Sequence, residues 1–183
     1  ETGTAPGGFH LSRSFLREFR SEHGYPLEDR LDALCGETPE SPAVRHDYNI
    51  TLNRLFTTNC SKTCHDWCEA RGLAFTGHFN EHAWPIPSGS PSSMAAQRWM
   101  HAPGLDLLGF QFRPGPLHKA ALWLFNVLEA VSISRQCGRG ETLCESSGGG
   151  GYEFGPAQMK PLEDFLLALG VNRLAPHLSH QTL

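Results

Sequence analysis

The chain has 183 residues, 39% of them apolar, and a formal net charge of −4 with both signs of charge well represented. This length suits one domain that buries a real core. The charge argues against a nucleic-acid partner, and no run approaches the 18 apolar residues of a membrane span. We expect residues 1–10 to be a flexible or expression-derived end and residues 11–183 to form a single domain.

Helical patterns dominate the first 70 residues. The spacing of apolar residues predicts a helix over 12–22, with Ser12 as its N-cap. A second, short helix is expected over 27–34. A long helix is expected over 44–70, and Gly72 ends it.

Strands alternate with helices in the rest of the chain. The predicted strands are residues 73–79, 104–110, 142–145 and 171–175, and the predicted helices are 94–100, 117–136 and 156–169. Such alternation is typical of βα units around a parallel sheet. A closed barrel needs eight strands, and four are found. The sequence therefore predicts an α/β fold, either a (β/α)-barrel-like domain or a partial TIM barrel.

Two of these strands end at a glutamate, namely Glu81 and Glu145. Ligand sites of α/β folds lie beyond the carboxyl ends of the strands, so both carboxylates are expected to face a pocket. A pair of carboxylates is the usual set of catalytic groups in glycoside hydrolysis. Glu81 is the candidate general acid and Glu145 the candidate base or nucleophile.

Other polar and aromatic side chains near the strand ends are candidates for sugar binding. The histidines have a structural alternative, because buried histidines are often only hydrogen-bonded parts of a core. Core packing is an equal alternative for the tryptophan, and an ion pair with a neighbour for the aspartate. The candidates are His78, Asn80, Trp84, His101, Asp106 and His177.

Two other catalytic patterns are excluded. Ser146 is not part of a Gly-x-Ser-x-Gly motif, so a serine hydrolase lacks support. The four glycines 148–151 are followed by Tyr-Glu rather than Lys-Ser or Lys-Thr, which excludes a P-loop.

The six cysteines have several interpretations. Cys137 and Cys144 flank a Gly-Arg-Gly turn and are disulfide candidates. The alternative is that the cysteines are small buried apolar residues. Cys60, Cys64 and Cys68 lie on one helix face, but they spread along about 12 Å of helix axis and do not all reach one ion.

Asn49 and Asn59 begin glycosylation sequons, which matter only on a eukaryotic secretory route. With the cysteines, they favour a secreted or extracellular protein, and a cytoplasmic location is the alternative.

Eight short motifs follow one another along the chain: Phe19–Leu27, Arg45–Tyr48, Asp66–Gly72, Thr76–His78, Met100–Asp106, Ser132–Gly138, Cys144–Tyr152 and Gly170–His177. In this order they resemble the central catalytic-barrel region of large bacterial glycoside hydrolases of the α-L-rhamnosidase-like type. The likeness covers roughly residues 15–180.

The resemblance implies a (β/α)8 catalytic domain that acts on plant or microbial polysaccharide. Glu81 and Glu145 match the strand-end glutamates of that family, and His78 matches its Thr-Gly-His motif. In such enzymes a calcium ion can help to hold the sugar. They are several times longer, and their earlier barrel strands and accessory β-domains have no counterpart in this sequence, so an incomplete pocket is also expected.

Two further interpretations stay open. In the first, the chain is a non-catalytic carbohydrate-binding or protein-interaction module derived from a barrel. In the second, it is a secreted, disulfide-stabilised domain whose glutamates are structural. Carbohydrate is the expected partner of the enzyme and of the binding module.

Overall fold

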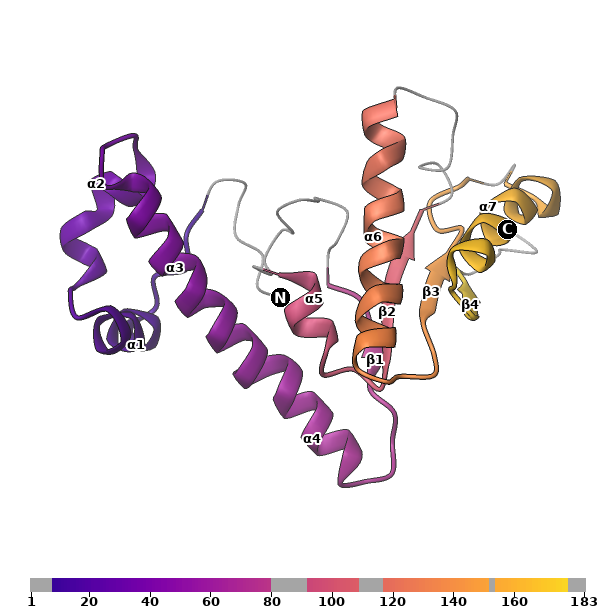
Figure 1. Cartoon of the computed structure of the whole chain (residues 1–183), viewed down its shortest axis with the longest axis horizontal. Helices are drawn as coiled ribbons and strands as arrows, with labels where there is room; N and C mark the ends of the chain where they lie inside the picture. Colours follow the sequence, from indigo (N-terminus) through magenta and orange to yellow (C-terminus); the bar gives the residue numbers. More distant parts are fainter. Residues whose placement is uncertain (1–7, 80–91, 109–116, 152–153, 178–183) are drawn as a thin grey trace.

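The computed structural model describes residues 8–79, 92–108, 117–151 and 154–177. It has two parts, a group of helices at the amino-terminal side and a parallel sheet with its own helices (Figure 1). The predicted α/β class is confirmed, since four parallel strands alternate with helices.

The helical part contains α1 (Arg13–His23), η1 (Leu27–Arg30), α2 (Leu31–Cys35) and α3 (Ser41–Phe56). As predicted, Ser12 caps α1, and its hydroxyl accepts a hydrogen bond from the Phe15 amide at 3.2 Å. Gly24 ends the helix in the left-handed conformation. These helices enclose a core of Phe15, Phe19, Leu27, Ala33, Leu34, Val44 and Tyr48.

The predicted long helix runs from Ser41 to Glu69, but it is not uniform. A π-helical segment, η2 (Thr57–Lys62), joins α3 to α4 (Thr63–Glu69). The spacing of apolar residues predicts one continuous helix and does not indicate this segment. α4 lies within the described part of the chain and buries none of its residues.

The strands are β1 (Thr76–Gly77), β2 (Ala102–Leu107), β3 (Leu143–Ser146) and β4 (Arg173–Pro176), paired in the order β1-β2-β3-β4. The helices between them are α5 (Ser93–Gln97), α6 (Leu117–Gln136) and α7 (Pro156–Leu169). The bounds of α6 and α7 are those predicted.

β1 is shorter than the predicted strand 73–79. The Phe75 amide donates to the side chain of His101 at 2.8 Å, while the Phe75 carbonyl accepts from the His101 amide. The chain therefore enters the regular ladder only at Thr76.

The two faces of the sheet differ in composition. In the register, Asp106 pairs with Glu145 and Glu145 with Ala175, so these residues point to the same face. Alternate residues point to the other face, where Leu105, Leu107 and Cys144 pack against α6 and α7. The face away from these helices carries His78, Gly104, Asp106, Glu145, Ala175 and His177, and we call it the site face.

No disulfide joins Cys137 and Cys144, both of which the structure describes. Cys144 is buried in the core on β3, whereas Cys137 is exposed just after α6. The alternation of side chains along β3 turns the Cys144 thiol toward the helices. None of the helices in the described ranges is both long and apolar enough to cross a membrane.

Candidate functional site

Glu145 lies at the centre of the site face, at the carboxyl end of β3. Its Oε2 is 3.4 Å from Nε2 of His78, which follows β1, and its Oε1 is 3.9 Å from Nε2 of His177, which follows β4. Asp106 is the register neighbour of Glu145 on β2. Four adjacent strands thus bring two carboxylates and two imidazoles together, as expected for strand ends of a parallel sheet.

A hollow lies beside these side chains. Its volume is about 330 Å³, and its lining includes Gly77, Leu143 and Ala175 in addition to His78, Glu145 and His177. The side chains of these three polar residues are partly accessible, with exposed fractions of 30% for His78, 38% for Glu145 and 48% for His177. A ligand can therefore reach them without a rearrangement of the sheet.

The loop after β3 holds this end of the sheet in place. The Ser147 amide donates to the Leu107 carbonyl at 3.1 Å, and the His177 amide donates to the Ser146 carbonyl at 2.7 Å. A Cβ atom on Gly148 would lie 3.1 Å from the Leu108 side chain and 3.5 Å from the His177 ring. The start of the glycine run therefore lets the backbone pass close to His177, the close approach that such a run favours.

The structure brings together four of the predicted site residues and separates one. Glu145, His78, Asp106 and His177 converge as described. His101 instead precedes β2 and lies at the opposite, amino end of the sheet. Glu81, Asn80 and Trp84 lie outside the described residues.

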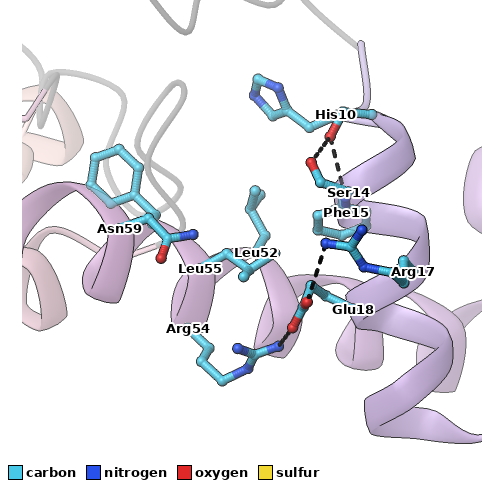
Figure 2. A pocket seen from close by; sticks show the side chains of 11 residues that line it. His10, Ser14, Phe15, Arg17, Glu18, Leu52, Arg54, Leu55 and Asn59 are labelled. Carbon is cyan, nitrogen blue, oxygen red and sulfur yellow. Dashed lines mark hydrogen bonds and ion pairs between the residues drawn. The ribbon is translucent and has the colours of Figure 1, made fainter.

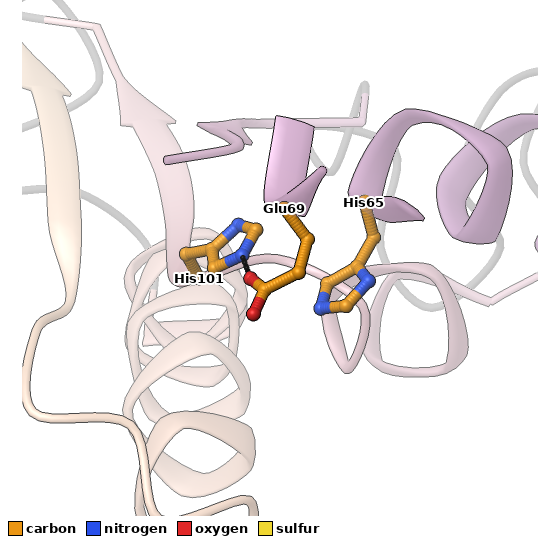
Figure 3. Close-up of side chains that lie close together, drawn as sticks. All are labelled: His65, Glu69 and His101. Atoms are coloured by element: carbon orange, nitrogen blue, oxygen red, sulfur yellow. Dashed lines mark hydrogen bonds and ion pairs between the residues drawn. The ribbon is translucent and has the colours of Figure 1, made fainter. Parts of the chain in front are cut away.

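His101 takes part in a different cluster, formed with His65 and Glu69 of α4 (Figure 3). Its Nδ1 accepts the Phe75 amide, so the ring proton is on Nε2, which donates to Glu69 Oε2 at 2.7 Å. The rings of His65 and His101 are stacked, with centroids 4.6 Å apart and planes 5° from parallel. The hydrogen bond from His101 holds the pKa of Glu69 below its usual value of 4.5.

Sequence reasoning missed Glu69. Its signal was available, because His65 and Glu69 are four residues apart on a helix and therefore neighbours on one face. The cluster ties the end of α4 to the starts of β1 and β2. We call it the amino-end cluster.

A second hollow, of about 410 Å³, lies between α1 and α3 (Figure 2). Two of its charged lining residues share the carboxylate of a third. Arg54 pairs with Glu18 at 3.4 Å, and Arg17 lies 3.8 Å from the same carboxylate. Its floor is apolar, with Phe15, Leu52 and Leu55. This hollow is larger than the one on the site face, but it collects no set of catalytic groups among the described residues.

The glycosylation sequons have exposed asparagines, Asn49 on α3 and Asn59 on η2. The hydroxyl residues of both sequons, Thr51 and Ser61, are fully buried. Each sequon is therefore part of a packed helix in the folded chain.

The donors on the site face do not fit calcium. Calcium takes six to eight oxygen ligands. The described residues that converge there supply the carboxylates of Asp106 and Glu145 together with an imidazole nitrogen of His78. Imidazole is a ligand for zinc, copper, iron and nickel rather than for calcium.

The scan against protein-family models found no match to this chain. The search of curated proteins likewise found no significant match.

Proposed function

We propose that the chain is a glycoside hydrolase domain whose pocket on the site face binds a sugar, with Glu145 as the catalytic base or nucleophile. One observation carries this proposal. Glu145 stands at the carboxyl end of a central parallel strand, in a partly open hollow, with Asp106 and two histidines around it. Carboxylates at strand ends are the groups that barrel glycosidases use.

The order of the strands supports a barrel-like arrangement as part of this proposal. The four described strands pair in chain order, β1-β2-β3-β4. A doubly wound sheet reverses its strand order at a switch point and binds its ligand there. A (β/α) barrel keeps chain order and collects its catalytic groups from successive strand ends. The sequential order therefore favours the predicted barrel type over a doubly wound sheet.

The second carboxylate of the mechanism has two candidates. Glu81 remains the predicted general acid, and Asp106 is the carboxylate that the described structure holds next to Glu145. One carboxylate oxygen of each lies within 4.8 Å of the other. Carboxyl groups of retaining enzymes are about 5–5.5 Å apart and those of inverting enzymes about 6.5–9.5 Å. If Asp106 is the partner, the close spacing favours retention, with Glu145 as the nucleophile.

Hydrolysis of a panel of aryl glycosides tests the function. For Glu145→Gln we expect a loss of kcat/KM of about 10²–10⁴-fold, because a carboxamide cannot act as base or nucleophile. Glu28→Gln, at an exposed residue of η1, is the matched control and should keep full activity. Unchanged turnover by a folded Glu145→Gln protein would refute the assigned role.

The general acid is identified by comparing the activity of variants toward glycosides with different leaving groups. A general-acid variant keeps most of its activity toward dinitrophenyl glycosides, whose leaving group needs no proton, and loses activity toward alkyl glycosides. Glu81→Gln and Asp106→Asn are compared in this way. If wild-type protein binds sugars but turns over none of the panel, the chain is the non-catalytic binding module.

An extracellular location belongs to the same proposal, because polysaccharide substrates lie outside cells. The exposed side chains of Asn49 and Asn59 agree with it. Detection of glycans on the secreted protein by mass spectrometry tests it.

A further inference from the structure

The site face carries a donor set that suits a metal ion, and two of its members, His78 and Glu145, line the hollow. His78, Asp106 and Glu145 each offer one ligand atom, and these three atoms lie within 4.8 Å of one another. The donors come from the ends of three adjacent strands, so the register of the sheet fixes their relative positions. His177 stands on the far side of Glu145, 3.9 Å from its Oε1.

The separation of two of the donors matches tetrahedral coordination. Two ligands that bind Zn²⁺ at about 2.0–2.1 Å are roughly 3.3 Å apart in a tetrahedral site. The separation of His78 Nε2 from Glu145 Oε2 is 3.4 Å. Three protein ligands and one open position are the usual composition of a zinc site that exchanges ligands, and the partly open hollow supplies access to that position.

We propose that His78, Asp106 and Glu145 bind one divalent transition-metal ion of the Zn²⁺ class, in preference to calcium. The donor set decides the class of ion, because one imidazole and two carboxylates fall well short of an all-oxygen calcium site.

The amino-end cluster shows what a similar set of residues looks like when it does not suit a metal. An imidazole nitrogen binds a metal with a lone pair that lies in the ring plane. The rings of His65 and His101 are stacked and nearly parallel, so no single point lies in both planes. The 2.7 Å from His101 Nε2 to Glu69 Oε2 is a hydrogen bond, and the proton on Nε2 blocks its lone pair. The cluster therefore serves as an internal control.

Metal binding has a consequence for the proposed hydrolysis. An ion held by Glu145 occupies the lone pairs that a base or nucleophile needs. We therefore expect Zn²⁺ to inhibit hydrolysis and a chelator to restore it. This consequence rests on the proposed function, whereas metal binding itself does not depend on turnover.

Direct titration with Co²⁺ tests the site on the full chain. Thiolate ligands give Co²⁺ an intense charge-transfer absorption that nitrogen and oxygen ligands lack, so the spectrum separates this site from the exposed thiols of Cys35, Cys64 and Cys137. We expect one Co²⁺ per chain without thiolate absorption. Zn²⁺ should displace this ion, and an equal concentration of Ca²⁺ should not.

Variants assign the ligands. Loss of an outer-shell partner of a metal ligand already weakens metal binding by ~10–100-fold. His78→Ala and Asp106→Asn each remove a direct ligand and should therefore weaken Co²⁺ binding at least as much. Glu69→Gln, in the amino-end cluster, should bind as tightly as wild type. Thiolate absorption alone, displacement by calcium, or equal affinity in His78→Ala and Glu69→Gln would each overturn the proposal. A protein that binds Co²⁺ as expected but hydrolyses no glycoside would refute the proposed function and leave the metal site standing.

Discussion

The two ends of the sheet use similar residues in opposite ways. At the carboxyl end, His78 and His177 flank Glu145 at 3.4 and 3.9 Å, beside an open hollow. At the amino end, His101 binds Glu69 at 2.7 Å and the Phe75 amide at 2.8 Å. The first set borders a hollow that a ligand can enter, whereas in the second both ring nitrogens of His101 are engaged by the protein itself.

This contrast between the two ends of the sheet shows that residue type alone does not identify a ligand site. Histidine and glutamate occur at both ends, and the sequence alone assigned His101 to the same pocket as the residues of the carboxyl end. The position of a residue in the sheet decides whether a ligand can reach it. Side chains at the carboxyl ends of the strands border a hollow, whereas those at the amino ends join α4 to the first residues of β1 and β2.

The largest expected effect comes from Gly104→Ala, which disturbs both ends. A Cβ at this position would lie 2.3 Å from the Gly77 carbonyl oxygen and 3.4 Å from that of Leu143. Since these contacts are with backbone, β1 must move away. We expect a loss of about 3 kcal/mol in the free energy of unfolding, measured by urea denaturation.

Gly140→Ala is the matched control, because a Cβ there meets no atom within 4 Å. Equal stability of the two alanine variants would show that β1 does not depend on close contact with Gly104. The displacement of β1 should also carry His78 away from Asp106, so Gly104→Ala should weaken Co²⁺ binding.

His101→Ala separates the two ends. Its removal leaves the Phe75 amide without its acceptor, which costs about 1–2 kcal/mol of unfolding free energy. Binding of Co²⁺ and turnover should stay unchanged, because His101 lies at the amino end. His46→Ala, on the exposed side of α3, is the control and should be close to neutral. A His101→Ala protein with normal stability but weaker metal binding would reverse the assignment of the ends.

The smallest effect is a pH dependence at the amino end. The hydrogen bond from His101 lowers the pKa of Glu69 below 4.5. A carboxyl with a depressed folded-state pKa stabilises the fold above its unfolded value and loses this contribution as the pH falls through the folded value. The stability difference between wild type and Glu69→Gln should therefore shrink as the pH falls below about 4.5.

The same titration in a His101→Ala background supplies the control. Without His101, the stability difference that Glu69→Gln causes should be nearly independent of pH in this range. A persistent pH dependence in that background would show that another group, rather than His101, lowers the pKa of Glu69.

Much of the fold was predictable because local signals were strong. The bounds of α6 and α7 follow from apolar spacing and from Pro156 and Gly170 at the ends of α7. Ser12 caps α1 as its hydroxyl and position indicate. The strands were harder, since the point at which β1 begins is set by a hydrogen bond to the side chain of His101, which is distant in sequence.

The candidate site was predictable in part. Glu145, His78 and His177 were identified from their places at strand ends. Asp106 was identified as a charged residue inside an apolar strand, and the register of the sheet sets it beside Glu145. His101 was assigned to the same pocket although it precedes the strand and therefore lies at its amino end. Glu69 was not considered, since its partner is fixed only by tertiary structure.

The π-helical segment η2 has a consequence for how this sequence can vary. Each residue of an α-helix turns the chain by about 100°, so one residue more or less within Thr57–Lys62 rotates everything beyond it by that angle. α3 buries Val44, Tyr48 and Thr51, whereas α4 directs His65 and Glu69 toward the sheet. The length of this segment sets the angular phase between the two faces, and it should tolerate substitutions far better than insertions or deletions.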